Sequence, residues 1–296
     1  MLTAPPLKAG KKDAYLRFID IQGMRILSLF LACSLLISCS KFAKVQKSRD
    51  YDYKLTMANE YYEKKKYNYA QQLFEELFPI VKGTEKFENV YFKYAYCAFY
   101  QRDYMNAENL FKGFVEVFPT SSRAEEMSYM RAYSYYKQSP KVELDQTNTH
   151  KAIGFMQTFI NTHPGSVRIK EATEIIDKSR VKLEAKEARS AELYYNVGQY
   201  KAAAIAYATL LNNYPDSQKG DQYKLQVIHS YFQYASLSVD EKKPERYAQV
   251  VSECNDFMDK FPNSGLVKEV EKFLSNSQHT INNIKEEKNE QVKKTT

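Results

Sequence analysis

One short motif occurs four times in the sequence, as FPTS at residues 118–121, HPGS at 163–166, YPDS at 214–217 and FPNS at 261–264. Each copy has an aromatic residue or histidine before proline and a serine two residues after it. The four prolines stand 45, 51 and 47 residues apart. Self-similarity at this spacing is typical of repeat proteins, in which one supersecondary unit stacks on the next.

The residues before each proline have the spacing of one helix face. Positions twelve, eight and five before the proline hold Ala107, Phe111 and Phe114; Ala152, Met156 and Phe159; Ala203, Tyr207 and Leu210; and Val250, Cys254 and Phe257. Steps of four and three residues place side chains on one side of an α-helix. Proline ends such a helix because it lacks an amide hydrogen, and we expect the serine after it to cap the next helix.

A second small residue precedes each of these helices at a fixed interval. The interval is twelve residues from Ala58 to Ala70, Ala95 to Ala107 and Ala191 to Ala203, and twenty from Ala132 to Ala152 and Ser230 to Val250. This is the tetratricopeptide (TPR) pattern, in which two helices approach closely at small side chains and a proline ends the unit. The longer interval predicts eight-residue insertions near 139–146 and 238–244.

The sequence therefore predicts an all-α fold, a right-handed superhelical array of about five TPR-like helical pairs with a C-terminal capping helix. The predicted pairs cover residues 51–80, 87–119, 122–163, 180–215 and 218–262. Residues 167–197 contain no helix breaker and predict one long helix. We expect the repeat domain to span 51–265, the capping helix 266–284, and a disordered charged tail 285–296.

The N-terminal region has the pattern of an export signal. Residues 26–39 form an apolar run behind Arg25 that is too short to cross a bilayer. The end of this run resembles the lipobox of bacterial lipoproteins, with Leu36, Ile37, Ser38 and Cys39 in register. The alternative is an ordinary secretion signal whose cysteine happens to fall there.

The lipobox resemblance implies that Cys39 carries a covalent diacylglycerol and an N-acyl chain, which together would anchor the protein stably. Residues 1–38 would then be an N-terminal extension and signal peptide, with Met24 as the expected start, and 39–50 a lipidated linker. In bacterial lipoproteins an aspartate directly after the lipobox cysteine tends to retain the protein at the inner membrane. The serine at position 40 therefore implies an outer-membrane anchor facing the periplasm.

Composition argues against the main enzyme classes and against nucleic acid. The nine glycines of the 296 residues are scattered, so neither nucleotide-binding fingerprint is present. The 43 basic and 36 acidic residues give a charge of +7, but they are interleaved without a basic stripe. The four histidines lack zinc-site spacing, and no nucleophile elbow occurs. We expect no enzyme, no metal and no cofactor beyond the lipid, and we expect Cys97 and Cys254 to be buried core residues.

The remaining functional candidate is a peptide groove. In TPR arrays the concave wall is made by the first helix of each pair, at positions six and three before its small residue and one and four after it. These positions hold Asp52, Leu55, Asn59 and Tyr62; Asn89, Phe92, Tyr96 and Phe99; and Glu126, Tyr129, Tyr133 and Tyr136. Aromatic rings give apolar contact area at low entropy cost, which suits an extended peptide. The alternative is that some of these rings are core between repeats.

Together these features resemble the BamD family, the TPR-repeat lipoproteins of the outer-membrane β-barrel assembly machine. The stretch 128–133, Ser-Tyr-Met-Arg-Ala-Tyr, is similar to a family core motif with alanine in place of glycine, and residues 145–166 followed by 193–195 resemble its third repeat and connecting helix. The third-repeat loop is shorter here than in the family. The resemblance implies a scaffold without catalysis.

The same resemblance implies the partners of that scaffold. Its C-terminal repeats would bind the POTRA domains of a BamA-like barrel protein beside other assembly-machine lipoproteins, and its N-terminal repeats would bind unfolded outer-membrane proteins. The runner-up is another periplasmic TPR lipoprotein, one for pilus assembly or cell-envelope coordination. An envelope hydrolase is disfavoured because the repeats occupy the chain.

Overall fold

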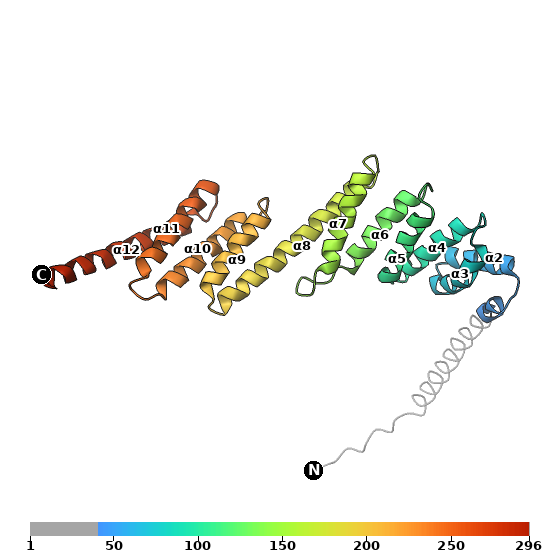
Figure 1. The fold of residues 1–296 in the computed structure, drawn as a ribbon, viewed down its shortest axis with the longest axis horizontal. Coiled ribbons are helices and arrows are strands. Elements are labelled where there is room, and N and C mark those ends of the chain that lie inside the picture. Colours follow the sequence, from blue (N-terminus) through green and yellow to red (C-terminus); the bar gives the residue numbers. More distant parts are fainter. Residues whose placement is uncertain (1–40, 296) are drawn as a thin grey trace, which may run out of the picture. The chain divides into compact units, whose positions relative to one another are not determined.

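The computed structural model describes residues 41–295, and within this range the chain is helical with short connections and no strand. Figure 1 shows the described helices following one another along the chain, joined by short connections. In chain order they are α2 (Tyr51–Glu63), α3 (Tyr67–Val81), α4 (Phe87–Tyr100), α5 (Tyr104–Val117), α6 (Ala124–Gln138), α7 (Thr147–Thr162), α8 (Ile169–Asn196), α9 (Tyr200–Asn213), α10 (Gly220–Ser236), α11 (Lys243–Lys260) and α12 (Val267–Thr295). The predicted all-α, TPR-like fold is confirmed, with α2 to α11 as the predicted helices and α12 as the capping helix.

The chain divides into two compact units, Met1–Ser134 and Tyr135–Thr296, here called the first and second unit. In the first unit α3 packs against α2 and α4, and α4 packs against α5. In the second unit each helix from α7 to α12 packs against the next one, and α12 also contacts α10. Each unit therefore builds its core from contacts between neighbouring helices.

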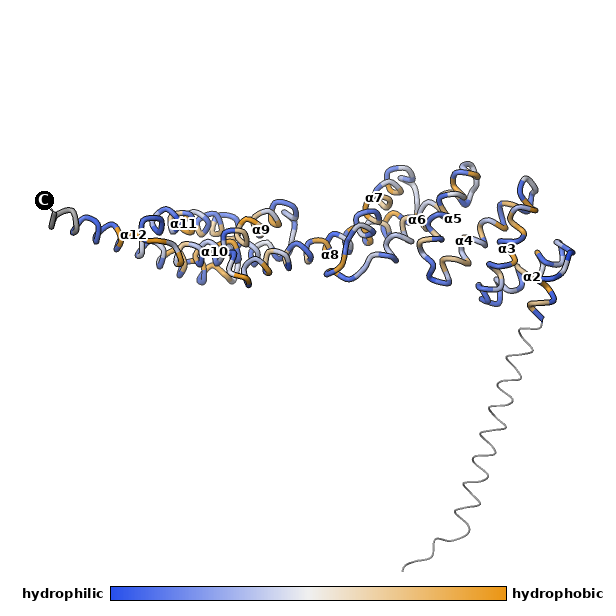
Figure 2. Tube along the Cα trace, turned by 60° about the horizontal axis from the view of Figure 1, so that its bottom comes forward, coloured by the Kyte–Doolittle hydropathy of each residue, from blue (hydrophilic) through white to orange (hydrophobic). Residues whose placement is uncertain are grey.

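The small residues of the repeat pattern lie completely inside the helical pairs. The alanines at 58, 70, 95, 107, 132, 152, 191 and 203 are all 0% exposed, and so are Ser230 and Val250 in the fifth pair. Side chains of this size let the helix axes come close, which is why the pattern needs them at these places. The bulky residues predicted on the same helices, such as Phe111, Phe159 and Phe257, are also buried. Figure 2 shows the matching contrast between hydrophobic stretches in the helices and mostly hydrophilic turns.

The serine of the repeated motif does not cap the next helix, contrary to our expectation. The helix begins three residues later, and the serine hydroxyl instead accepts a hydrogen bond from the amide two residues on, as Ser121 Oγ does from Arg123 N at 3.0 Å. The same hydroxyl donates to a carboxylate on the first helix of the pair that precedes the serine. This bond joins Ser121 to Glu88 at 2.7 Å and Ser217 to Glu184 at 2.6 Å. The serine thus ties two consecutive repeats together.

The insertion in the third pair lies where the sequence predicts it, between α6 and α7. Residues 139–146 run beside the long helix α8, whose lysines hold the loop through a serine hydroxyl and backbone carbonyl groups. Lys182 Nζ donates to Ser139 Oγ at 2.6 Å and to Pro140 O at 3.1 Å, and Lys186 Nζ donates to Leu144 O at 2.7 Å. The loop is therefore fastened to α8 at both of its ends.

Two terminal segments differ from the prediction. Residues 41–46, expected to be part of a linker, form a short helix that packs on the first pair through Phe42 and Val45, which are 7% and 2% exposed. Helix α12 continues past residue 284 to Thr295, where we predicted a disordered tail. Glutamate, lysine and glutamine have high helix propensity, which favours continuation of an existing helix even without burial. The predicted signal peptide, lipobox and Cys39 lie outside the described residues.

Candidate functional site

The predicted groove residues of the first unit lie on α2, α4 and α6, and most of their rings touch one another. The ring centroids of Phe92 and Tyr96 are 4.9 Å apart, and those of Tyr96 and Phe99 are 6.5 Å apart. Phe99 then meets Tyr133 at 5.8 Å, and Tyr133 stacks on Tyr129 at 5.9 Å and 16°. The five rings form one connected series from α4 to α6, here called the aromatic wall.

Two members of the aromatic wall are core residues in this structure. Tyr129 is 1% exposed and Tyr96 is 7% exposed. The Tyr96 hydroxyl donates to Glu126 Oε1 at 2.6 Å, and its ring packs edge-on against Phe111 at 5.4 Å. The half-buried rings of Phe92, Phe99 and Tyr133 are the ones that offer surface to a ligand. Burial therefore divides the predicted groove into a supporting layer and a contact layer.

Asn59 and Tyr62 on α2 belong to the same side of the first unit and are linked to α4 by a lysine. Lys93 Nζ donates to Asn59 Oδ1 at 2.9 Å and lies 5.1 Å from the centre of the Tyr62 ring. Burial raises the pKa of Tyr62, so this phenol stays neutral at physiological pH. The Arg123 guanidinium covers the Phe92 ring at 4.4 Å. The aromatic wall thus has cationic groups along its edge.

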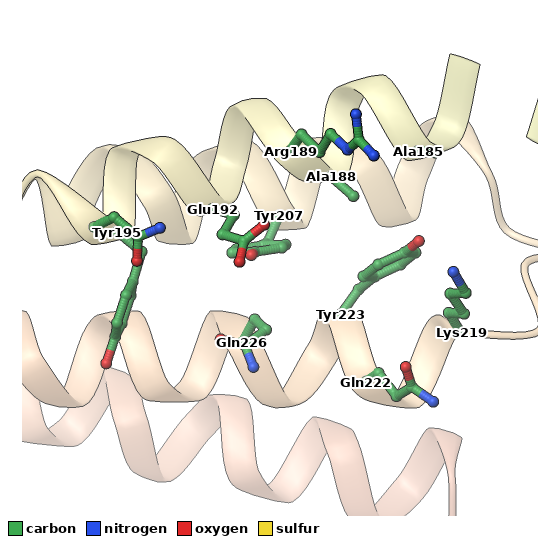
Figure 3. A pocket seen from close by; sticks show the side chains of 11 residues that line it. Ala185, Ala188, Arg189, Glu192, Tyr195, Tyr207, Lys219, Gln222, Tyr223 and Gln226 are labelled. Carbon is green, nitrogen blue, oxygen red and sulfur yellow. The ribbon is translucent and has the colours of Figure 1, made fainter. Parts of the chain in front are cut away.

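Tyr136, the last predicted groove residue, stands on the part of α6 that belongs to the second unit, where it is half-buried. The second unit also contains a cleft of about 560 Å³ between α8 and α10, with α9 behind it. Figure 3 shows Glu192 and Tyr195 of α8, above, pointing toward α10 and Tyr223 of α10, below, pointing toward α8, whereas Arg189 points away from α10. The lining residues are Ala185, Ala188, Arg189, Glu192, Tyr195, Asn196, Tyr207, Lys219, Gln222, Tyr223 and Gln226.

The cleft exists because small and polar side chains stand where the aromatic wall has rings. On α8 the short side chains of Ala185 and Ala188 leave open space above the helix surface. The buried rings of Tyr207 and Tyr223, with centroids 6.4 Å apart, form the inner wall of the cleft. Burial raises the pKa of Tyr207 to about 12. Burial and a hydrogen bond to Glu184 raise that of Tyr223, whose hydroxyl donates to Glu184 Oε1 at 2.9 Å. Both phenols therefore remain uncharged hydrogen-bonding groups.

The sequence analysis missed this cleft, although the signal was present. The rule that located the groove positions in the first three pairs was not applied to the fourth. Counted from Ala191, it gives Ala185, Ala188, Glu192 and Tyr195, and all four line the cleft. In the fifth pair, counted from Ser230, the last two positions give Tyr231 and Tyr234.

Tyr231 and Tyr234 line a second, smaller cleft of about 400 Å³ together with three cationic residues, Lys201, Lys242 and Arg246. The Arg246 guanidinium stacks on the Tyr234 ring at 4.0 Å and bonds Ser238 Oγ. The cationic side chains would favour an acidic or carboxylate-bearing segment. These two clefts of the second unit thus offer a polar, rather than an aromatic, contact surface.

The chemistry available at these surfaces is recognition. Among the described residues no group of three or more histidine, cysteine or carboxylate side chains could hold a metal ion. Cys97 and Cys254 are free and buried, and burial raises the pKa of each thiol to about 12, so neither is an activated nucleophile. Half-buried rings, amides and fixed charges bind peptide through apolar contact and hydrogen bonds.

Paired helices, buried small residues at the repeat positions and a groove face on each unit define a TPR-like helical-repeat protein. Within that class, the model of the family described as "YfiO: Outer membrane lipoprotein" matches residues 52–232. The chain belongs to this family. Such repeat scaffolds are generally not enzymes. No described helix is long and apolar enough to cross a bilayer.

Two curated relatives carry the name BamD. A candidate outer membrane protein assembly factor BamD of Aquifex aeolicus (strain VF5) is 26% identical over 233 residues, which are 76% of this chain and 75% of that protein. The outer membrane protein assembly factor BamD of Rickettsia prowazekii (strain Madrid E) is 23% identical over 169 residues, 57% of this chain and 67% of that protein.

Solved structures give a weaker likeness. The TPR2AB domain of yeast Sti1, solved in complex with pHSP90, has a TM-score of 0.38 and 12% identity over 77% of this chain and 98% of that one. The TPR domain of P58(IPK) has a TM-score of 0.36 and 14% identity over 89% of this chain and 68% of that one. At these scores neither structure bears on function.

Proposed function

We propose that the chain is a lipid-anchored scaffold of outer-membrane β-barrel assembly, held at the membrane by acyl chains on Cys39. The observation that carries the proposal is the family match over residues 52–232, with BamD as the name of both relatives. The groove faces support a binding role because they offer rings, amides and fixed charges. In this role binding energy, rather than bond chemistry, guides the barrel precursor.

The two units would serve different partners. The aromatic wall of the first unit would receive extended segments of unfolded outer-membrane proteins, whose strands alternate aromatic or apolar residues with polar ones. The clefts of the second unit would bind POTRA domains of a BamA-like barrel protein, beside other lipoproteins of the machine. Polar, charged clefts suit a folded partner, because interfaces between folded proteins include direct hydrogen bonds and a polar rim.

Recovery of partners from detergent-solubilised membranes tests the scaffold role. We expect a POTRA-bearing barrel protein to co-purify with the tagged, lipidated chain. Recovery of only pilus-assembly or envelope-coordination proteins would replace this proposal by the runner-up. The anchor is tested separately, because Cys39→Ala should move the protein from the membrane fraction to the soluble fraction. If the variant stays in the membrane fraction even when residues 1–38 have been removed, lipid on Cys39 is not the anchor.

The substrate role of the aromatic wall is tested with a peptide copied from the C-terminal strand of an outer-membrane barrel. Tyr133→Ala and Phe99→Ala should each weaken binding about tenfold, because each removes a half-buried ring from the contact layer. Tyr53→Ala is the control, since Tyr53 is 41% exposed on α2 and lies outside the groove positions. Equal binding by all three variants would rule out the aromatic wall as the peptide site.

A further inference from the structure

The segment that follows the proposed lipidation site is folded onto the first helical pair. The Phe42 ring stacks on Tyr69 with centroids 4.4 Å apart and meets Tyr61 edge-on at 5.8 Å. Farther along the segment, Lys54 Nζ donates to Gln46 O at 2.9 Å. Residues 41–46 are therefore held at both ends and cannot act as a flexible spacer.

These contacts fix the direction in which the segment runs. Phe42 lies beside Tyr61 and Tyr69, which are each three residues from the turn between α2 and α3, while Gln46 bonds Lys54 near the start of α2. The N-terminal end of the segment is thus at the turn between α2 and α3. Two residue steps separate Lys41 from Cys39, a reach of about 7 Å. Any lipid on Cys39 enters the membrane next to this turn.

The turn itself is a run of lysines, Lys64, Lys65 and Lys66, all exposed. Lys64 pairs with Glu60, and Lys64 and, less strongly, Lys41 lower the pKa of that carboxyl, which places Lys41 in the same neighbourhood. The other nearby carboxylate, Glu63, pairs with Lys93 at 3.1 Å. Four cationic groups therefore surround the point where the chain leaves for the anchor, with Glu60 as the acidic residue among them. We call Lys41 and Lys64–Lys66 the lysine patch.

We propose that the lysine patch is a membrane-contact surface that binds the anionic phosphate headgroups of the leaflet holding the anchor. A basic side chain close to an anionic membrane surface strengthens binding to that surface, and several such residues reinforce a lipid anchor. The contact would hold the first helical pair against the membrane surface. The location of the membrane rests on the lipid anchor proposed above, but the charge of the patch does not.

The test uses the chain from residue 40 onward, the proposed mature protein without its acylated cysteine, so that neither acyl chains nor the apolar run of residues 26–39 contributes to binding. Sedimentation with vesicles of equal parts phosphatidylglycerol and phosphatidylcholine should pellet this protein at low salt, and vesicles of phosphatidylcholine alone should not. The triple variant Lys64→Gln, Lys65→Gln, Lys66→Gln should lower the partition coefficient at least tenfold, and salt should do the same to the unaltered patch. The control is Lys170→Gln, Lys268→Gln, Lys272→Gln, which removes the same charge from exposed positions of the second unit.

Equal binding by the two triple variants, or equal binding to neutral and anionic vesicles, would overturn the proposal. Both triple variants should melt at the temperature of the parent, because all six lysines are exposed. The result is independent of the anchor. If the patch binds vesicles but the natural protein does not fractionate with membranes, the lysine patch stands and the lipid anchor falls.

Discussion

The groove faces of the two units occupy equivalent repeat positions and are built in opposite ways. Three residues before the small residue, the third pair has Tyr129, which is 1% exposed, whereas the fourth has Ala188, which lines an open cleft. One residue after the small residue, the third pair has Tyr133 in the aromatic wall and the fourth has Glu192. Rings that pack on one another close the surface, and an alanine in the same register leaves it open. Substitution of one or two groove residues in a helical pair is therefore enough to replace a closed aromatic surface by an open polar cleft.

Exchanging the side chains at this position gives the largest expected effect. Tyr129→Ala removes a fully buried ring from the first unit and should lower the free energy of unfolding by about 3–5 kcal/mol. Ala188→Tyr should change it by less than about 1 kcal/mol, because the new ring enters a cleft of about 560 Å³. Urea unfolding of the full chain with Cys39→Ala, followed by circular dichroism, measures both. A similar loss in both variants would mean that the cleft is closed in solution.

Two glycines inside second helices extend the comparison to the packing between helices. A Cβ added at Gly113 of the first unit would lie 2.1 Å from Tyr91 Oη, whereas nothing lies within 4 Å of a Cβ at Gly154 of the second. The Tyr91 ring is held by Phe78 at 4.7 Å and Phe114 at 5.7 Å. Gly113→Ala should therefore destabilise by about 1–3 kcal/mol, and Gly154→Ala should stabilise by about 0.5–1 kcal/mol.

Thermal melting of the two glycine variants checks this prediction. The helix-propensity gain is the same at both sites, so the difference between them isolates the contact with Tyr91. Tyr91→Phe combined with Gly113→Ala should recover part of the loss, because it removes the clashing hydroxyl. Equal stabilisation by both alanines would show that the Tyr91 ring moves aside freely.

The sequence predicts the paired helices well because small residues, helix faces and prolines act within one repeat. It does not predict which groove rings are buried, because the exposure of Tyr96 and Tyr129 depends on Phe111 and on neighbouring rings of other helices. The sequence also does not predict that residues 41–46 are folded. Their composition is that of a basic linker, and their helix is held by the stacking of Phe42 on Tyr69 of another helix. The cleft between α8 and α10 is predictable from the sequence, because the groove positions counted from Ala191 include Ala188 and Glu192. The prediction that the serine after each proline caps the next helix was wrong, because serine is equally suited to a turn in which its hydroxyl bonds a carboxylate on another helix.

The two ion pairs of the buried Lys224 make the second unit sensitive to acid. Lys224 bonds both Glu253 and Asp256, and although burial works against the charged form, bonds from Lys224 and Lys260 hold the pKa of Asp256 below its usual 3.8. A depressed carboxyl pKa adds stability above the unfolded value, and that stability is lost as the pH falls through the folded value. The second unit should lose stability as the pH falls below about 3.8, and Asp256→Asn should weaken this dependence. A pH series of urea midpoints measures it, and an unchanged slope would exclude Asp256 as the titrating group.

The smallest expected effect concerns two serines of the second unit that are equally buried but differently satisfied. Ser230 Oγ donates to Gln226 O at 2.7 Å, whereas Ser277 Oγ, at 0% exposure on α12, has no hydrogen-bond partner among the described residues. A buried hydroxyl without a partner costs desolvation and returns nothing, so Ser277→Ala should raise the free energy of unfolding by about 0.5–1 kcal/mol. Ser230→Ala loses a bond that the hydroxyl makes within its own helix and should change stability less favourably. Thermal melting of both variants measures these changes. A destabilised Ser277→Ala chain would mean that the hydroxyl has a hydrogen-bond partner in solution, and hence that α12 packs against the fifth pair differently.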